Sequence, residues 1–228
     1  MYPETMSAFQ NEEVRRQFVA KVFGIVFVQL AVTTVVVVAC RWNENAYNYI
    51  RDNVWVYWTS WAVALATVLV LACGGEARRK YPMNYILLSL LTVAFSFLMA
   101  VITTFYDADV VAYALIITCG VVFACVLLAC VCRLDFTKLY GVLMALAVAL
   151  FIALIIGLFW ANSTLYITIG ALGAVLFSLF LIHDIQLVMG GRQRQIGPDE
   201  YIFAALMVYL DVINIFQYIL LILGMTRG

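Results

Sequence analysis

Two aspartates, Asp184 and Asp211, lie inside stretches that are otherwise apolar enough to cross a membrane. The first lies within residues 165–189 and the second within residues 201–223. A carboxylate placed in hydrocarbon costs roughly 2.5–3.5 kcal/mol even on lenient insertion scales, so it normally has a partner or a task. Two such residues in one small protein indicate that they serve each other or serve a cation.

These two aspartates are expected to meet, because only a short connection separates their spans and both lie in the same half of the bilayer. Two carboxyl groups that meet in a poorly hydrated place share a proton, which makes the pair sensitive to pH. When deprotonated, the same oxygens suit Ca²⁺, a hard cation that takes carboxylate and carbonyl ligands. Asp184 and Asp211 are therefore candidates for a pH sensor and for the metal contacts of a Ca²⁺ path. The alternative is a buried pair that only ties two helices together.

Further polar side chains lie close to the aspartates in both spans. Asn214 follows Asp211 by three residues and therefore shares a helix face with it. Asn214 and Gln186 are candidate supporting residues for the pair. His183 points about 100° around the helix from Asp184, so we expect it to be structural or interfacial and to stay outside the pair.

The elements that must position these residues are membrane-spanning helices. The chain is 66% hydrophobic and 11% charged, whereas soluble domains carry about 25% charged residues. Crossing the hydrocarbon core takes about 20 apolar residues in a helix. Seven stretches qualify, at about residues 21–40, 54–73, 83–105, 110–132, 139–160, 165–189 and 201–223. We expect an all-α integral membrane protein, with a short cytosolic segment at residues 1–20 and one seven-helix transmembrane domain at residues 21–228.

Lysine and arginine are distributed unevenly over the predicted loops. Ten of the thirteen lie on one side of the membrane, in the N-terminal segment and the second, fourth and sixth loops. They are Arg15, Arg16, Lys21, Arg78, Arg79, Lys80, Arg133, Lys138, Arg192 and Arg194. The positive-inside rule then predicts a cytosolic N-terminus and, with seven spans, a C-terminus outside or in a lumen. A re-entrant last segment would return the C-terminus to the cytosol.

Composition and motifs argue against several other functions. The chain has one histidine, whereas a zinc hydrolase needs several His or Cys ligands. It has no Walker-type phosphate loop and no G-x-S-x-G elbow, so we expect no enzyme. The net charge of zero removes the electrostatic argument for binding nucleic acid. The six cysteines form no C-x-x-C pair, and we expect neither a disulfide framework nor a resident cofactor.

Small residues recur at helical spacing in two of the predicted spans. Gly170 and Gly173 lie in the sixth span, and Gly141 lies in the fifth with alanines four and eight residues on. Such stripes let membrane helices approach closely. We therefore expect close helix packing at these glycines.

Several motifs resemble those of a known family. They are IHDIQ at residues 182–186, PDEY at 198–201, YLDVINIF at 209–216, KYPMN at 80–84 and TFYD at 104–107. Together they resemble the transmembrane Bax-inhibitor-motif family, in particular lifeguard and the Golgi anti-apoptotic proteins. The resemblance covers nearly the whole chain from about Val14. The chain departs from it in having no acidic residue within residues 92–104 and in carrying His183 where a tyrosine is common.

The resemblance implies a seven-helix protein that lets Ca²⁺ leak from intracellular stores and suppresses apoptosis. The gate of the family is an aspartate pair that maps onto Asp184 and Asp211. A basic residue after the second span serves as counter-charge in some members, and Arg78 and Arg79 are the candidates here. The implied location is the Golgi, the endoplasmic reticulum or another endomembrane. The implied partners are the lipid bilayer, Ca²⁺ as permeant ion, and Ca²⁺-release channels or apoptotic regulators.

Two functions follow as expectations. The first is a pH-responsive Ca²⁺ leak channel of intracellular membranes that lowers store Ca²⁺ and suppresses apoptosis. The alternative is a non-conducting anti-apoptotic membrane adaptor that modulates a partner channel or an apoptotic regulator. Efflux of Ca²⁺ from liposomes that hold the purified protein alone distinguishes them.

Overall fold

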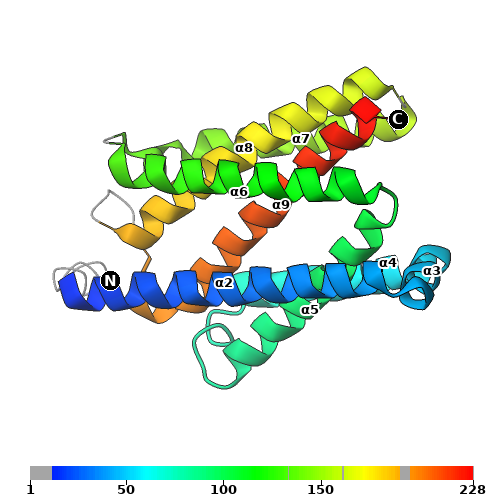
Figure 1. Ribbon diagram of the computed structural model, residues 1–228. Coiled ribbons are helices and arrows are strands. Elements are labelled where there is room, and N and C mark those ends of the chain that lie inside the picture. Colours follow the sequence, from blue (N-terminus) through cyan, green and yellow to red (C-terminus); the bar gives the residue numbers. More distant parts are fainter. Residues whose placement is uncertain (1–11, 133, 161, 191–195, 228) are drawn as a thin grey trace. The chain divides into compact units, whose positions relative to one another are not determined.

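The computed structural model describes residues 12–132, 134–160, 162–190 and 196–227 (Figure 1). Within these ranges every element is helical, and seven helices are long and apolar enough to cross a membrane. They are α2 (Glu12–Trp42), α4 (Val54–Cys73), α5 (Met83–Thr103), α6 (Ala108–Val131), α7 (Tyr140–Phe159) with the short η1 (Phe136–Leu139), α8 (Ser163–Met189), and α9 (Tyr201–Arg227) with the short η2 (Pro198–Glu200). The predicted fold class is confirmed: the chain is an all-α, multi-pass membrane protein.

The helix boundaries differ from the predicted ones at two places. Helix α2 begins at Glu12, well inside the segment predicted to precede the first span, and Glu12 and Glu13 lie in its first turn. Acidic residues stabilise the positive end of a helix, so the polar residues before the apolar run extend it. The predicted loop after the first span contains α3 (Glu44–Asp52), whose N-cap Asn43 accepts hydrogen bonds from the N–H groups of Asn45 and Ala46. Residues 1–11 and the loop arginines Arg133, Arg192 and Arg194 lie outside the described residues.

The chain divides into two compact units, and each is described by itself. The N-terminal unit comprises Glu12–Asp107 together with Gly197–Leu206. In it, α5 packs against both α2 and α4. Gln29 Nε2 of α2 donates to Thr92 Oγ1 of α5 at 2.9 Å, and Ser96 Oγ donates to Thr33 Oγ1 at 3.2 Å. Such buried hydrogen bonds hold membrane helices together where no hydrophobic force distinguishes protein from lipid.

The C-terminal unit comprises Ala108–Ile196 and Met207–Gly228. Helix α8 packs against both α6 and α7, and the three helices run side by side in Figure 1. Leu143 and Leu150 of α7 form a buried cluster with Ile169 and Leu176 of α8. The unit also contains most of α9, so both aspartates belong to it.

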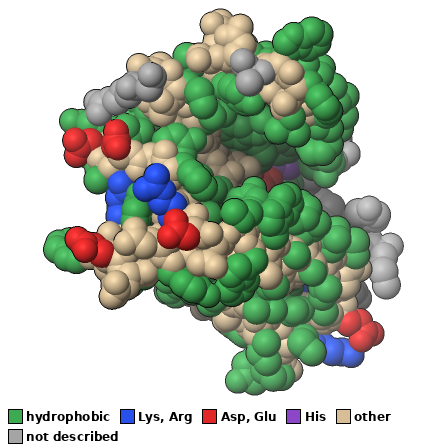
Figure 2. All heavy atoms as spheres, turned by 90° about the vertical axis from the view of Figure 1, so that its right-hand side faces the viewer, with side chains coloured by type: hydrophobic (Ala, Val, Ile, Leu, Met, Phe, Trp, Pro, Cys, Tyr) green, Lys and Arg blue, Asp and Glu red, His purple; other side chains and the backbone are tan. Residues whose placement is uncertain are grey.

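The outside of the helices is apolar. Figure 2 shows hydrophobic side chains over most of the visible face, and the exposed ones include Phe27, Leu69, Ile116, Phe151 and Leu172. A soluble monomer rarely exposes such large apolar patches, whereas a membrane protein presents them to lipid. These helices therefore contact the lipid bilayer.

Candidate functional site

Helices α8 and α9 pack closely and antiparallel through two glycines. A Cβ atom on Gly170 would lie 2.7 Å from Ile222, and one on Gly173 would lie 2.5 Å from the ring of Tyr218. A later residue of α8 therefore contacts an earlier residue of α9, which makes the two helices antiparallel. The predicted close packing at these two glycines is confirmed. At Gly141 it is wrong, because a Cβ there would meet nothing within 4 Å.

The same antiparallel register brings Asp184 and Asp211 together. Their side chains lie close enough to interact with each other, and both are buried. Two carboxyl groups in contact repel each other when both are ionised and can hydrogen-bond only when one of them carries a proton. Asp211 Oδ2 has no hydrogen-bond donor among the described residues. The predicted meeting of the two aspartates is observed; their role as a sensor stays a prediction.

His183 joins the aspartates, contrary to the expectation from sequence. Its Nδ1 lies 2.7 Å from Asp184 Oδ1, and its ring stacks on Tyr140 of α7 with centroids 5.6 Å apart. The 100° between neighbouring positions describes the Cα–Cβ directions alone, and side-chain torsions carry the ring back to Asp184. The signal was present in the sequence as the sole histidine beside an intramembrane aspartate.

The two predicted supporting residues make other contacts. Gln186 Nε2 donates to the carbonyl of Leu134 at 3.0 Å, and Gln186 Oε1 accepts from the N–H of Phe136 at 2.9 Å. Gln186 thus ties the end of α8 to the connection between α6 and α7. Asn214 Nδ2 donates to the carbonyl of Leu210 in its own helix at 2.7 Å. Both side chains therefore form hydrogen bonds with backbone groups.

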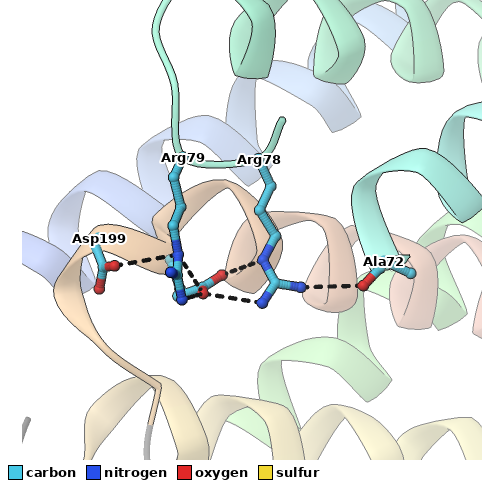
Figure 3. A network of polar contacts seen from close by, with 5 residues as sticks. Ala72, Arg78, Arg79 and Asp199 are labelled. Atoms are coloured by element: carbon cyan, nitrogen blue, oxygen red, sulfur yellow. Dashed lines mark hydrogen bonds and ion pairs between the residues drawn. The ribbon is translucent and has the colours of Figure 1, made fainter. Parts of the chain in front are cut away.

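A second polar cluster lies in the N-terminal unit, where two arginines meet Glu200 at the start of the last span (Figure 3). We call it the Arg–Glu cluster: Arg78, Arg79, Asp199 and Glu200. Arg78 Nε lies 2.6 Å from Glu200 Oε2, an ion pair outside hydrogen-bond geometry, while its Nη2 donates to Glu200 Oε1 at 3.0 Å. Arg79 Nε donates to the same Oε1 at 2.8 Å and lies 3.3 Å from Asp199 Oδ2.

The Arg–Glu cluster anchors the last span to the connection between α4 and α5. Arg78 Nη1 also donates to the carbonyl of Ala72 in the last turn of α4 at 3.2 Å, and its guanidinium lies 4.7 Å from the ring centre of Phe203. Hydrogen bonding to Glu200 raises the pKa of Arg79, so the guanidinium of Arg79 stays charged. Glu200 is thus the observed counter-charge of both arginines. Their predicted pairing with Asp184 in a closed state stays a prediction.

The cation-binding capacity of the described residues is small. No three His, Cys, Asp or Glu side chains in the described ranges cluster so that they could hold a metal ion. Asp184 and Asp211 offer carboxylate oxygens, the ligand type that Ca²⁺ takes, and their part in a Ca²⁺ path stays a prediction.

Comparison with known proteins places this arrangement in a family. The family described as "inhibitor of apoptosis-promoting Bax1" matches residues 15–228. Protein lifeguard 3 of Mus musculus and its counterpart of Homo sapiens are each 35% identical over 224 residues, which cover 95% of this chain and 71% of the relative. The chain belongs to the Bax inhibitor family. The Golgi anti-apoptotic protein of Vaccinia virus (strain Lister) is 29% identical over 220 residues, 96% of this chain and 90% of the viral protein.

The match to the Bax inhibitor family includes both polar sites. Residues 15–228 contain every helix described here except the first three residues of α2. The predicted resemblance to the lifeguard and Golgi anti-apoptotic branch is therefore confirmed. The chain is a multi-pass membrane protein of an anti-apoptotic family.

Proposed function

We propose that this Bax inhibitor family member is a pH-responsive Ca²⁺ leak channel of intracellular membranes that lowers store Ca²⁺ and suppresses apoptosis. The observation that carries the proposal is the buried contact between Asp184 of α8 and Asp211 of α9. A carboxyl pair in a membrane span is costly unless it has a task, and its charge changes by one when the shared proton leaves.

The proposal links protonation to helix packing. With one proton the two carboxyl groups attract each other, and without it they repel. Because α8 and α9 approach closely at Gly170 and Gly173, a change of force between the aspartates acts directly on the contact between two spans. In this proposal, a permeating Ca²⁺ exchanges part of its hydration shell for the same oxygens.

Ca²⁺ efflux from liposomes that hold the purified protein alone tests the proposal. We expect a leak whose rate depends on pH between about 6 and 8, where coupled buried carboxyl groups can titrate. Asp184→Asn and Asp211→Asn should each flatten this dependence, since asparagine keeps the shape of the side chain and cannot titrate. The matched control is Asp109→Asn, an exposed position in the first turn of α6. Silent wild-type liposomes would favour the adaptor function.

The cellular setting is part of the same proposal. A relative named Golgi anti-apoptotic protein supports residence in the Golgi or endoplasmic reticulum. The basic loop residues support a cytosolic N-terminus. Ca²⁺-release channels and apoptotic regulators are the proposed protein partners.

A further inference from the structure

His183 has two ring nitrogens with different surroundings. Nδ1 lies 2.7 Å from Asp184 Oδ1, whereas Nε2 is buried and has no hydrogen-bond partner among the described residues. When Asp184 is the ionised member of the pair it can only accept, so the hydrogen then belongs on Nδ1, which donates it to Asp184. Nε2 then keeps its lone pair. In this tautomer the buried atom without a partner, Nε2, is an acceptor and not an N–H group. This agrees with the surroundings of the ring, where no described group pairs with Nε2.

The ring of His183 is held on a second side. It stacks on Tyr140 at the start of α7, with an interplanar angle of 29° and a centroid distance of 5.6 Å. The whole side chain is 2% exposed. A ring fixed by both a hydrogen bond and a stacked neighbour cannot turn without breaking one contact. The direction of its N–H group is therefore determined by α7 as well as by α8.

We propose that His183 is a positioning residue that holds the Asp184 carboxylate in the orientation in which it meets Asp211. Neighbouring positions on a helix do not face each other by default, so this contact exists because packing selects the rotamers. With Oδ1 held by the imidazole, the Asp184 carboxylate cannot rotate away from α9. The inference deepens the proposed function, on which its link to Ca²⁺ flux rests.

The other groups around the site leave this task to His183. Asp211 of α9 faces Asp184 and brings a carboxyl group, not an N–H group. Cys125 of α6 lies near Asp211 and brings a thiol, not an N–H group. Tyr140 contacts the imidazole through its ring face. Of these side chains, His183 is the one that brings an N–H group to Asp184.

Two substitutions separate the donor from the ring. His183→Phe keeps an aromatic ring against Tyr140 and removes the donor. His183→Asn removes the ring and supplies an amide N–H near the position of Nδ1. In each background and in the wild type, the thermal unfolding midpoint in detergent is measured for Asp184→Asn, Asp211→Asn and the double variant. The departure from additivity reports the coupling between the two aspartates.

We expect a coupling on the order of 3 °C in the wild type. It should fall to less than a third in His183→Phe and persist in His183→Asn. A residue that only fills space would lower all midpoints equally and leave the coupling unchanged, which would overturn the proposal. If His183→Phe does not fold, the same cycle in His183→Leu decides, because leucine also removes the donor. Intact coupling there would also overturn the proposal.

Ca²⁺ flux provides the second readout. In liposomes, His183→Phe should flatten the pH profile of Ca²⁺ flux as Asp184→Asn does. The separate variant His183→Asn should keep the profile of the wild type. Absence of flux from the wild type would contradict the channel function, while the unfolding cycle would still test the role of His183. An unaltered flux profile in a folded His183→Phe variant would overturn the positioning role.

Discussion

At the scale of single residues, we propose that Asp184 and Asp211 share one proton and so act as a unit. Removing either carboxyl group removes the shared proton, after which the second substitution has little left to change. In liposome flux we therefore expect the double asparagine variant to differ little from the stronger single variant. Effects on the pH profile that add up would mean that the two aspartates work independently. The exposed Asp109→Asn variant provides the baseline for a charge change elsewhere.

At the scale of elements, the Arg–Glu cluster fixes the start of the last span. We expect Glu200→Gln to lower the free energy of unfolding by about 2 kcal/mol, less than the roughly 3–5 kcal/mol of a fully buried pair, because the cluster is partly exposed. Arg78→Gln should cost more than Arg79→Gln, since the side chains are 19% and 52% exposed respectively. Thermal unfolding in detergent measures these changes. Lys80→Gln is the control, because its pair with Glu76 is exposed and contributes little.

The same variants distinguish two partners for the arginines. If Glu200 is the functional counter-charge, Glu200→Gln should alter the basal Ca²⁺ leak in the same sense as Arg78→Gln, and combining them should add little. If the arginines instead pair with Asp184 in a closed state, Asp184→Asn should reproduce the arginine variant and Glu200→Gln should not. The double variant Arg78→Gln/Arg79→Gln provides the last test. If it is expressed normally and its Ca²⁺ leak is unchanged, neither arginine has a gating role.

The approach of α8 to α9 depends on a missing side chain. Gly173→Ala would place a Cβ 2.5 Å from the ring of Tyr218, so we expect a loss of about 1–3 kcal/mol in stability. Gly120→Ala in α6 meets nothing within 4 Å and should be neutral or stabilising by up to about 1 kcal/mol. Unfolding midpoints of the pair, measured side by side, test this. Equal midpoints would mean that the ring moves freely and that the glycine is not needed for close packing.

At the scale of the whole molecule, the basic residues predict how the chain is inserted. A protease-sensitive tag after Met1 should be cleaved from the cytosolic side of intact vesicles, and a tag after Gly228 should be protected. Arg227 and the exposed tryptophans Trp42, Trp55 and Trp160 lie on the side predicted to be luminal. Cleavage of both tags from the cytosol would show that the segment containing Asp211 re-enters instead of crossing.

The number and type of elements could be predicted from the sequence because lipid leaves few choices. A run of about 20 apolar residues has no water to satisfy its backbone, so only a helix can cross. The meeting of Asp184 and Asp211 followed from the same constraint, since two spans joined by a short connection lie side by side and antiparallel. The role of Gly170 and Gly173 was visible as a stripe of small residues. Charge, composition and spacing were sufficient for these features.

Tertiary structure alone decided which polar groups pair with each other. From the sequence we expected His183 to lie away from the aspartates and Gln186 to lie beside them. We also expected Arg78 or Arg79 to pair with Asp184. In the structure, His183 contacts Asp184, Gln186 binds the backbone near Leu134, and the arginines bind Glu200. Periodicity describes the direction of a Cα–Cβ bond, whereas a hydrogen bond depends on rotamers and on residues far away in the chain. Those are selected only when the helices pack.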